Sequence, residues 1–366
     1  MDNHLTENNF LMVTNNNHSE GFPKKVYLLG QPTSQECRSA VFFIPYNHKA
    51  FILNNGANTF VYLPVLKEIE FNEVYIETLP EYPKSELKEF KQSQTKEEYI
   101  EKVNKLLSHI QRGDIYEVNY CLEFYIENIA INPFSLFKTL NEIAEAPYSA
   151  LLRIDNKYVI SASPELFLKK DDDKIITKPI KGTIKRGKTV EEDQLMKKQL
   201  VESLKERTEN VMIVDVARND LSVVAKRGSV AVPKLFDIES YKTVHQMVST
   251  VTCEVNQDIN INSIIGATFP MASMTGAPKI RAMQLIDKHE SFKRTEYSGT
   301  LGIIDEKGDF ISSVLIRTIV YDKTLNRISF AVGSAITSQC NPEKEYEECL
   351  LKAEALKRAV EKTIQA

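Results

Sequence analysis

The alternation of apolar and polar residues along the chain predicts both strands and helices. Two β-rich runs, Ala40–Pro45 and Asn58–Leu66, are separated by turn signals such as Asn54-Asn55-Gly56. In Lys96–Arg112 the apolar side chains recur at helical spacing instead. We therefore expect short strands followed by a helix that ends at Gly113.

Two longer helices are predicted by the residues at their N-termini. Thr189 and Glu192 have the spacing of a capping box, and the helix that they begin is expected to run to about Asn210. Asn341 is a suitable cap for the last helix, and Pro342 suits its first position. An apolar stripe then continues through that helix, as in a helix packed on a core.

Strand-like runs recur between these helices, around residues 115–128, 149–154, 157–162 and 174–180. Many strands with irregularly placed helices predict an α+β fold with large, mostly antiparallel sheets. Residues 1–25 are rich in Asn and lack periodicity, so a loose N-terminus is expected there. Residues 26–90 are expected to form a β-rich part packed on the core, and residues 91–366 the main domain.

The composition excludes several classes of protein. The 366 residues are 42% hydrophobic with a net charge of −4, which allows a large core but gives no electrostatic footprint for nucleic acid. No apolar run is long enough to span a bilayer, and no secretory signal is visible. The five cysteines are scattered without zinc-ligand spacing. We expect a cytoplasmic protein with free thiols and without nucleic-acid or membrane partners.

Two pairs of glutamates stand three residues apart on predicted helices: Glu206 with Glu209, and Glu345 with Glu348. Residues with this spacing share a helix face, and Lys352 continues the row on the last helix. Mg²⁺ prefers hard oxygen ligands and is commonly held by one or two carboxylates and a ligand anion. The two faces could hold a metal against an acidic substrate, although such pairs are also common on solvated helix faces.

The segment Gly182–Thr189 fits the phosphate-loop pattern G-x-x-x-x-G-K-[ST] between a strand-like run and a helix. A phosphate-binding NTPase is therefore the alternative from a different class. Against it, the loop interior is Thr-Ile-Lys-Arg, whereas a phosphate cradle is helped by several glycines. The preceding run also carries Lys178 and Pro179, which do not suit a buried parallel strand.

Lys181 and Glu165 are candidates for chemistry, because each lies next to a strand-like run. In a cleft, partial burial would lower the pKa of Lys181 and free its amine for nucleophilic attack. The alternative is a rim lysine in a salt bridge. Apolar surroundings would raise the pKa of Glu165 and make it a general acid, whereas the alternative is a turn glutamate after Pro164.

Two further residues carry weaker signals. His245 lies in an amphipathic stretch, where a single histidine is usually structural. Arg317 lies inside the apolar run Ser313–Thr318 and needs a buried anionic partner, either a protein carboxylate or a substrate.

Eight ordered stretches between about residues 95 and 362 add a stronger signal. They are SPELFLKK from Ser163, PIKGTIKRG from Pro179, KERTENVMIVDVARNDL from Lys205, VHQMVSTV from Val244, TGAPKIRAMQLID from Thr275, YSGTLGIID from Tyr297, LIRT from Leu315 and PEKEYEECLLKAEAL from Pro342. Together they resemble the chorismate-utilising enzyme family, which comprises anthranilate synthase large subunits, aminodeoxychorismate synthase component I, and isochorismate and salicylate synthases.

This resemblance implies a large α/β sandwich of two mostly antiparallel sheets around a deep cleft, with residues 91–366 as the chorismate-binding catalytic domain. It also implies Mg²⁺. Carried over position by position, Glu209 and Glu348 would be direct metal ligands, and Glu206 and Glu345 would act through water. The metal would bridge to the ring carboxylate of chorismate.

The resemblance also implies roles for the other site residues. Glu165 would protonate the departing C4 hydroxyl, and His245 would lie beside the reacting ring. Tyr297 and Arg317 would hold the pyruvyl carboxylate, with charge from Lys352 near the metal. The remaining substrate-binding positions would be Thr183, Ser273 and Gly333.

Lys181 indicates which reaction of the family to expect. Makers of anthranilate, isochorismate and salicylate generally carry Ala, as PIAGT, whereas aminodeoxychorismate synthases carry Lys, as PIKGT. The amine would attack ring C2 and expel the C4 hydroxyl, so that ammonia adds at C4. The product would be 4-amino-4-deoxychorismate, which leads to p-aminobenzoate and folate. The alternative within the family is an anthranilate synthase large subunit.

Other positions depart from the family pattern. Water-adding members use a lysine where this chain has Glu117, so isochorismate or salicylate formation is not expected; aminating members usually have Gln there. Residues that replace usual glycines are Met271, Ala272, Ser334 and Ala335. Nothing in the chain resembles a glutaminase, so the resemblance implies a separate glutamine amidotransferase subunit that supplies ammonia. A regulatory tryptophan site is not expected.

Overall fold

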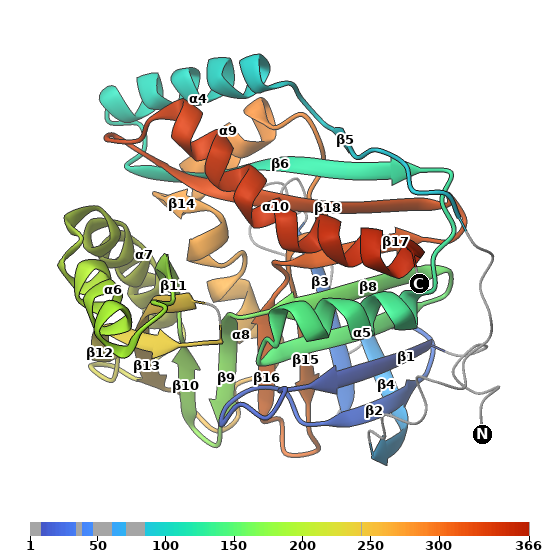
Figure 1. Ribbon diagram of the computed structural model, residues 1–366. Helices are drawn as coiled ribbons and strands as arrows, with labels where there is room; N and C mark the ends of the chain where they lie inside the picture. Colours follow the sequence, from blue (N-terminus) through green and yellow to red (C-terminus); the bar gives the residue numbers. More distant parts are fainter. Residues whose placement is uncertain (1–8, 34–38, 47–60, 71–84, 243, 366) are drawn as a thin grey trace.

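The computed structural model describes residues 9–33, 39–46, 61–70, 85–242 and 244–365. Within these ranges the strands pair antiparallel, in two sheet halves that share β4 (Val61–Glu70). On one side β4 pairs with β2 (Lys25–Leu29), and on the other it pairs with β3 (Ala40–Tyr46). One strand therefore joins the two halves (Figure 1).

The first half continues from β2 to a long pair of central strands. Its order after β2 is β1 (Asn9–Thr14), β7 (Tyr148–Ile154), β8 (Lys157–Ser163), β17 (Thr318–Asp322), β18 (Arg327–Thr337) and β6 (Glu117–Glu127). The free side of β6 pairs with β5 (Lys91–Gln92) and β14 (Gly276–Ala277).

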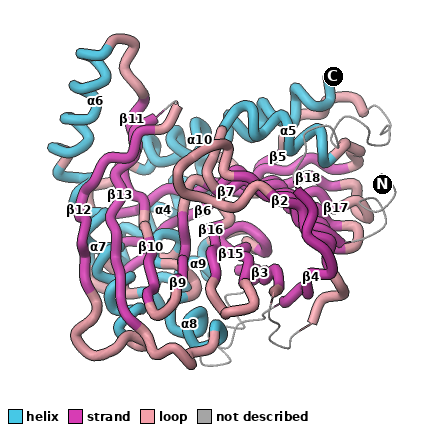
Figure 2. The backbone as a smooth tube through the Cα atoms, turned by 90° about the horizontal axis from the view of Figure 1, so that it is seen from below, coloured by secondary structure: helices cyan, strands magenta, loops and turns pink. Residues whose placement is uncertain are grey.

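The second half continues from β3 to a strand that pairs with three others. Its order is β15 (Thr295–Ile304), β16 (Phe310–Val314), β9 (Leu166–Asp171), β10 (Lys174–Thr177) and β13 (Val244–Glu254). β13 also pairs with β11 (Ile180–Lys185) and β12 (Ala231–Ser240), and Figure 2 shows β11, β12 and β13 side by side.

Helices cover both halves, which gives four layers. The first half is covered by α4 (Lys96–Gln111), α5 (Pro133–Ala144) and α10 (Pro342–Gln365), with α9 (Lys279–His289) beside β14 and β6. The second half is covered by α6 (Val190–Glu202), α7 (Leu204–Ser222) and α8 (Ile261–Thr268).

Three apolar clusters separate these layers. One lies under α4, α5 and α10, another lies under α7 and α8, and the third lies between the two sheet halves. The α+β fold with large antiparallel sheets is therefore confirmed. Among the described residues, no helix combines the length and the apolar character that crossing a membrane requires.

The predicted helix starts are confirmed, but one predicted helix is interrupted. Thr95 caps α4 with a full capping box, and Asn341 accepts hydrogen bonds from the first turn of α10. Thr189 caps α6, but that helix ends at Glu202 and does not reach Asn210. Ser203 leaves the helical conformation and caps α7, with its hydroxyl accepting from the N–H of Glu206.

Two other predictions are wrong. The expected loose N-terminus is wrong for Asn9–Thr14, because this segment is the fully buried β1 and pairs with β2 and β7. The phosphate-loop alternative is also wrong, because Gly182 and Lys185 belong to β11, which pairs antiparallel with β13. The turn signal Asn54-Asn55-Gly56 lies outside the described residues. The domain boundary near residue 90 stays a prediction.

Candidate active site

Lys181 lies on β11, beside a break in the register with β13. Gly182 follows it at φ +90°, and a Cβ at that position would lie only 3.0 Å from Glu206 Oε2. The Lys181 side chain is 10% exposed, and its ammonium donates to Oε1 of the fully buried Glu117 at 2.5 Å. A lysine of one sheet half and a glutamate of the other therefore form a buried ion pair.

The carboxylates around Lys181 raise its pKa. Burial alone would lower that pKa, but the charges of Glu117, Glu209 and Glu165 and the hydrogen bond to Glu117 outweigh burial. The expectation of a lowered lysine pKa is therefore wrong for this arrangement. It is wrong because the three carboxylates come from separate elements, which the sequence around Lys181 does not reveal.

Glu165 follows β8 and is 4% exposed. Burial raises its pKa to about 7, while the Ser273 hydroxyl, the charge of Lys181 and the backbone of Ile180 oppose the increase. A carboxyl group whose proton exchanges near neutral pH has the property that a general acid needs.

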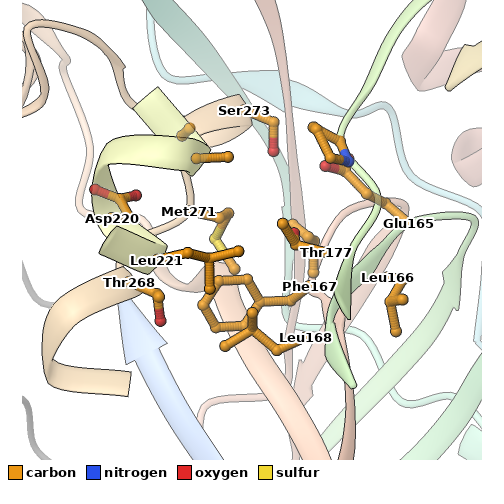
Figure 3. A pocket seen from close by; sticks show the side chains of 14 residues that line it. Glu165, Leu166, Phe167, Leu168, Thr177, Asp220, Leu221, Thr268, Met271 and Ser273 are labelled. Atoms are coloured by element: carbon orange, nitrogen blue, oxygen red, sulfur yellow. The ribbon is translucent and has the colours of Figure 1, made fainter. Parts of the chain in front are cut away.

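A small pocket lies beside Glu165 and Ser273 (Figure 3). Its apolar side is formed by Phe167, Leu168 and Leu221. Ser273 Oγ is buried and has no hydrogen-bond partner of standard geometry among the described residues. It nonetheless lies close enough to Glu165 to lower the pKa of that carboxyl group.

Two acidic helix faces meet near Lys181. Glu206 and Glu209 lie on α7, and Glu345 and Glu348 lie on α10. Burial raises the pKa of Glu206, and the negative charge of Glu348 raises it further. Because this effect requires proximity, the two faces are close. Between them, the Lys205 ammonium lies 3.3 Å from Glu345 Oε1 and 3.9 Å from Glu209 Oε1.

Glu209 is a buried carboxylate of this cluster, and its ion pair among the described residues is the long contact with Lys205. Burial raises its pKa to about 7, because the nearby lysines Lys181 and Lys205 only partly offset burial. Its Oε1 is buried and accepts no hydrogen bond from the described residues. An unsatisfied carboxylate oxygen beside further carboxylates is a donor set that suits Mg²⁺.

The side chains are not yet gathered as metal ligands. Among the described residues, no three His, Cys, Asp or Glu side chains already surround one metal position. The chemistry of the donors fits Mg²⁺, whereas their positions would have to change by side-chain rotation, beginning with Lys205 between Glu209 and Glu345.

Lys352 ties the second acidic face to β18. Its ammonium lies 2.6 Å from Glu348 Oε1 and donates to the carbonyl of Gly333 at 2.9 Å. Burial would raise the pKa of Glu348, but Lys352 lowers it below its usual value. Gly333 has no space for a side chain, because a Cβ would lie 2.7 Å from Cys121 Sγ.

Arg317 and Tyr297 offer groups for an anion. Arg317 stands between β16 and β17 at φ +50°, an uncommon conformation for a residue other than glycine. The residue is half-buried, and burial lowers the pKa of its guanidinium, with no charged group among the described residues to offset the effect. Tyr297 is 6% exposed, with its hydroxyl 4.0 Å from Cys121 Sγ. A half-buried cation without a counter-charge in the described part of the chain suits a substrate carboxylate.

Arg294 was not singled out from the sequence, yet it braces two segments of the site. It is 4% exposed, pairs with Glu290 at 2.6 Å, and donates to the carbonyls of Met274 and Asn119. These contacts hold the loop of Ser273 against the strand of Glu117. The usable signal was its position three residues before Tyr297, where one of the family-like stretches begins.

Two predicted site residues are not brought into contact with the others. The fully buried His245 contacts Asp193 and Ser240, both at 2.9 Å, and Asp193 in turn binds Arg186. This network anchors the start of α6 to β13. Thr183 lies on β11 near Lys181, but its side chain is exposed. Roles for His245 and Thr183 in catalysis or binding stay predictions.

Of the residues that replace family glycines, Met271, Ala272 and Ser334 are buried and Ala335 is half-buried. Met271 and Ala272 line the pocket beside Glu165. Ser334 makes a 2.9 Å hydrogen bond with the hydroxyl of Tyr99, so its added side chain joins the core under α4.

Comparison with known proteins agrees with the resemblance read from the motifs. Residues 46–358 match the protein family described as chorismate binding enzyme. The chloroplastic aminodeoxychorismate synthase of Arabidopsis thaliana is 41% identical over 78% of this chain and 31% of its own length. Aminodeoxychorismate synthase component 1 of Escherichia coli (strain K12) is 36% identical over 75% of this chain and 60% of its own.

A differently named relative is also similar. Anthranilate synthase component 1 of Aquifex aeolicus (strain VF5) is 38% identical over 75% of this chain and 55% of its own length. The chain thus spans between 31% and 60% of the length of these three relatives.

Solved structures share the fold at low sequence identity. Anthranilate synthase component I from Streptococcus pneumoniae TIGR4 gives a TM-score of 0.75 at 20% identity, over 95% of this chain and 92% of that one. The menaquinone-specific isochorismate synthase from Escherichia coli gives a TM-score of 0.77 at 15% identity, over 98% and 91%.

Proposed function

The chain belongs to the chorismate-binding enzyme family, and we propose that within it the chain aminates chorismate to 4-amino-4-deoxychorismate. The observation that carries the proposal is the buried amine of Lys181, placed among Glu117, Glu165 and the acidic face of α7. The ammonia would come from a separate glutamine amidotransferase subunit, and the relatives named component 1 support a partner of this kind.

Lys181 interacts through its charge with glutamates on both acidic helices, which supports a nucleophile that faces a substrate held by them. Its positive charge lowers the pKa of Glu206 and Glu209 on α7 and of Glu348 on α10, against the effect of burial. The charge of Lys181 also lowers the pKa of Glu165, against the effect of burial. These charge interactions of one amine with a proton-bearing carboxyl group and two acidic helices support a shared substrate site.

The proposed reaction uses the Lys181 amine as the nucleophile and the Glu165 proton to release the leaving group. Lys181 Nζ bonds to ring C2, the ring double bond shifts, and the C4–O bond breaks. Hydroxide is a poor leaving group, so Glu165 protonates it and water departs. Ammonia then bonds to C4, the double bond returns, and the C2–Nζ bond breaks. The pyruvyl group is retained, and Glu165 regains a proton from the new amine.

The substrate is a dianion, so its two carboxylates need cations. Arg317 and Tyr297 would hold the pyruvyl carboxylate, because the Arg317 guanidinium has no counter-ion in the described part of the chain. Glu209 and Glu348 would hold Mg²⁺ directly, and Glu206 and Glu345 through water. When bound, the metal would supply positive charge for the ring carboxylate. A cytoplasmic setting is part of this proposal.

The experiment that tests the function is mass spectrometry of the products formed from chorismate, Mg²⁺ and ammonium. We expect the mass of aminodeoxychorismate, lost or strongly reduced in Lys181→Ala. The exposed Lys185 on the same strand provides the matched control Lys185→Ala, which should leave the product unchanged. Fluorescent anthranilate formed without an added lyase would overturn the proposal in favour of anthranilate synthesis.

The partner is tested with the pure chain and two nitrogen sources. Activity with ammonium but not with glutamine supports a separate amidotransferase subunit. Hydrolysis of glutamine by the pure chain would contradict that assignment.

A further inference from the structure

Glu117 is the buried group in direct contact with the proposed nucleophile. Its Oε1 accepts the 2.5 Å hydrogen bond from Lys181 Nζ, and its side chain is fully buried. The second oxygen, Oε2, is buried without a hydrogen-bond partner among the described residues. In the described part of the chain, Lys181 is therefore the hydrogen-bond partner of the Glu117 carboxylate.

The protonated form of Lys181 in this ion pair cannot act as a nucleophile. An ammonium has no lone pair, so Lys181 must lose a proton before its nitrogen can bond to carbon. The surrounding carboxylates hold the proton on the amine in the resting protein. Transfer to bulk water is impeded because the amine is 10% exposed, whereas a carboxylate oxygen already lies at hydrogen-bond distance.

We propose that Glu117 is the general base that takes the proton from Lys181 when chorismate binds and returns it when the lysine leaves the ring. The inference rests on the proposed function, which makes Lys181 the nucleophile. It assigns a role to a position where aminating members of the family usually have Gln, which cannot accept a proton in this way.

The proton and electron balance closes within the site. The proton moves from Nζ to Glu117 Oε1, and the freed lone pair forms the bond to C2. The C4–O electron pair leaves with the oxygen, which takes the Glu165 proton and departs as water. After ammonia has bonded to C4, Nζ leaves C2 with its electron pair and recovers the proton from Glu117. No external oxidant, reductant or base is required.

The other charged groups that face Lys181 do not make this contact. Glu165 lies after β8, Glu206 and Glu209 lie on α7, and Glu348 lies on α10. Each interacts with the lysine through its charge, and none forms a hydrogen bond with Nζ within the described residues. In a dry site, transfer between hydrogen-bonded partners turns an ion pair into two neutral groups at little cost in solvation.

The first test compares pH profiles of kcat/KM for ammonium-dependent amination. Glu117→Gln keeps the shape of the side chain but removes the base. At saturating Mg²⁺ and below pH 7, where Glu165 keeps its proton, we expect a loss of about 100-fold and a new limb that rises about tenfold per pH unit as water takes the proton instead. Glu117→Asp should recover part of the rate and the wild-type pH dependence over this range. Glu123→Gln, on the same strand and paired with Arg327, is the control.

The second test does not need turnover. With ammonia omitted and Mg²⁺ present, chorismate binding should produce a protonated-carboxyl band in the infrared difference spectrum. The band should be absent from Glu117→Gln and present in Glu123→Gln. A spectrum of Glu117→Gln that matches the wild type would overturn the proposal.

The outcomes separate this inference from the proposed function. If the wild type makes aminodeoxychorismate and Glu117→Gln has an unchanged rate and profile, the base is wrong and the function stands. If Glu117→Gln loses the same factor of activity at every pH and Glu117→Asp does not restore it, Glu117 has a structural role alone. That outcome also overturns the proposal that Glu117 is the base. If the wild type makes another product, the function is wrong, and the infrared band still decides whether Glu117 receives a proton.

Discussion

The Lys205 ammonium on α7 lies 3.3 Å from the Glu345 carboxylate on α10, so the cation stands between the two acidic helices where a metal ion is proposed. Replacing it by Met should leave the carboxylates repelling one another in the metal-free protein. We expect Lys205→Met to lose about 1–2 kcal/mol of stability without Mg²⁺ and to bind Mg²⁺ up to about tenfold more tightly. Thermal unfolding and titration calorimetry measure both, with the exposed Lys198→Met as control. Weaker metal binding in Lys205→Met would contradict this.

Metal binding should release a proton near neutral pH. Burial raises the pKa of Glu209 to about 7, so its carboxyl group is protonated below that pH and must ionise before it can bind Mg²⁺. The affinity should therefore increase as the pH rises from 6 to 8. Calorimetry in two buffers of different ionisation enthalpy measures the released proton. Glu209→Gln should lose both the affinity and the proton release, and an affinity that does not change with pH would refute the assignment.

Activity should fall as the pH rises above about 7, because Glu165 loses the proton that it must donate. Burial raises the pKa of this carboxyl group to about 7, and the Ser273 hydroxyl opposes the increase. The descending limb of kcat/KM should fall about tenfold per pH unit. Ser273→Ala should move this limb to higher pH, because it removes a group that lowers the pKa. A limb that stays in place in Ser273→Ala would argue against Glu165 as the acid.

The same carboxyl group should cost stability at alkaline pH. Its folded pKa, about 7, is above the value of 4.5 for an unperturbed glutamate, so the folded state binds the proton more tightly than the unfolded state. The cost is absent below pH 4.5, grows between pH 4.5 and 7, and is complete above 7. Glu165→Gln should therefore be more stable than the wild type at pH 8 by up to about 3 kcal/mol.

That difference should vanish near pH 4.5. Denaturant unfolding at both pH values measures it, and the exposed Glu347→Gln should show no such dependence. Equal effects of Glu165→Gln at pH 4.5 and pH 8 would show that the carboxyl group is not protonated preferentially in the folded state.

Gly333 should not tolerate a side chain. A Cβ there would lie 2.7 Å from Cys121 Sγ and 3.0 Å from Asn119 Nδ2 in the core of the long strand pair. We expect Gly333→Ala to lose about 1–3 kcal/mol. Gly266 in α8 has open space around it, so Gly266→Ala should gain about 0.5–1 kcal/mol. Unfolding midpoints compare the two, and similar effects would show that crowding is unimportant.

The sequence predicts local structure where local chemistry decides it. Thr189 and Asn341 cap their helices as expected, because a cap acts within three residues. The apolar stripe predicts one continuous helix, but Ser203 interrupts it, because the Ser203 hydroxyl caps the start of α7. Asn9–Thr14 escaped prediction, since six residues are too short to show a period against an Asn-rich background.

The site could be predicted only in part. Glutamate spacing on each helix predicts two acidic faces, but not that they meet, which depends on the packing of distant segments. The raised pKa of Lys181 arises from Glu117, 64 residues earlier in the chain. Lys205 and Arg294 act through similar contacts between separate elements. The family resemblance names further candidate residues, but it did not single out Lys205 or Arg294 and gave no role for Glu117.

The pairing of β6 with β18 has a consequence for biosynthesis. Most of β6 is buried. It pairs along its whole length, from Glu117 to Glu127, with β18, which lies much later in the chain and ends at Thr337. Because ribosomes add about 5–20 residues per second, a long apolar strand would wait uncovered for tens of seconds on the nascent chain. Newly made molecules should therefore depend on chaperones until the last strand emerges.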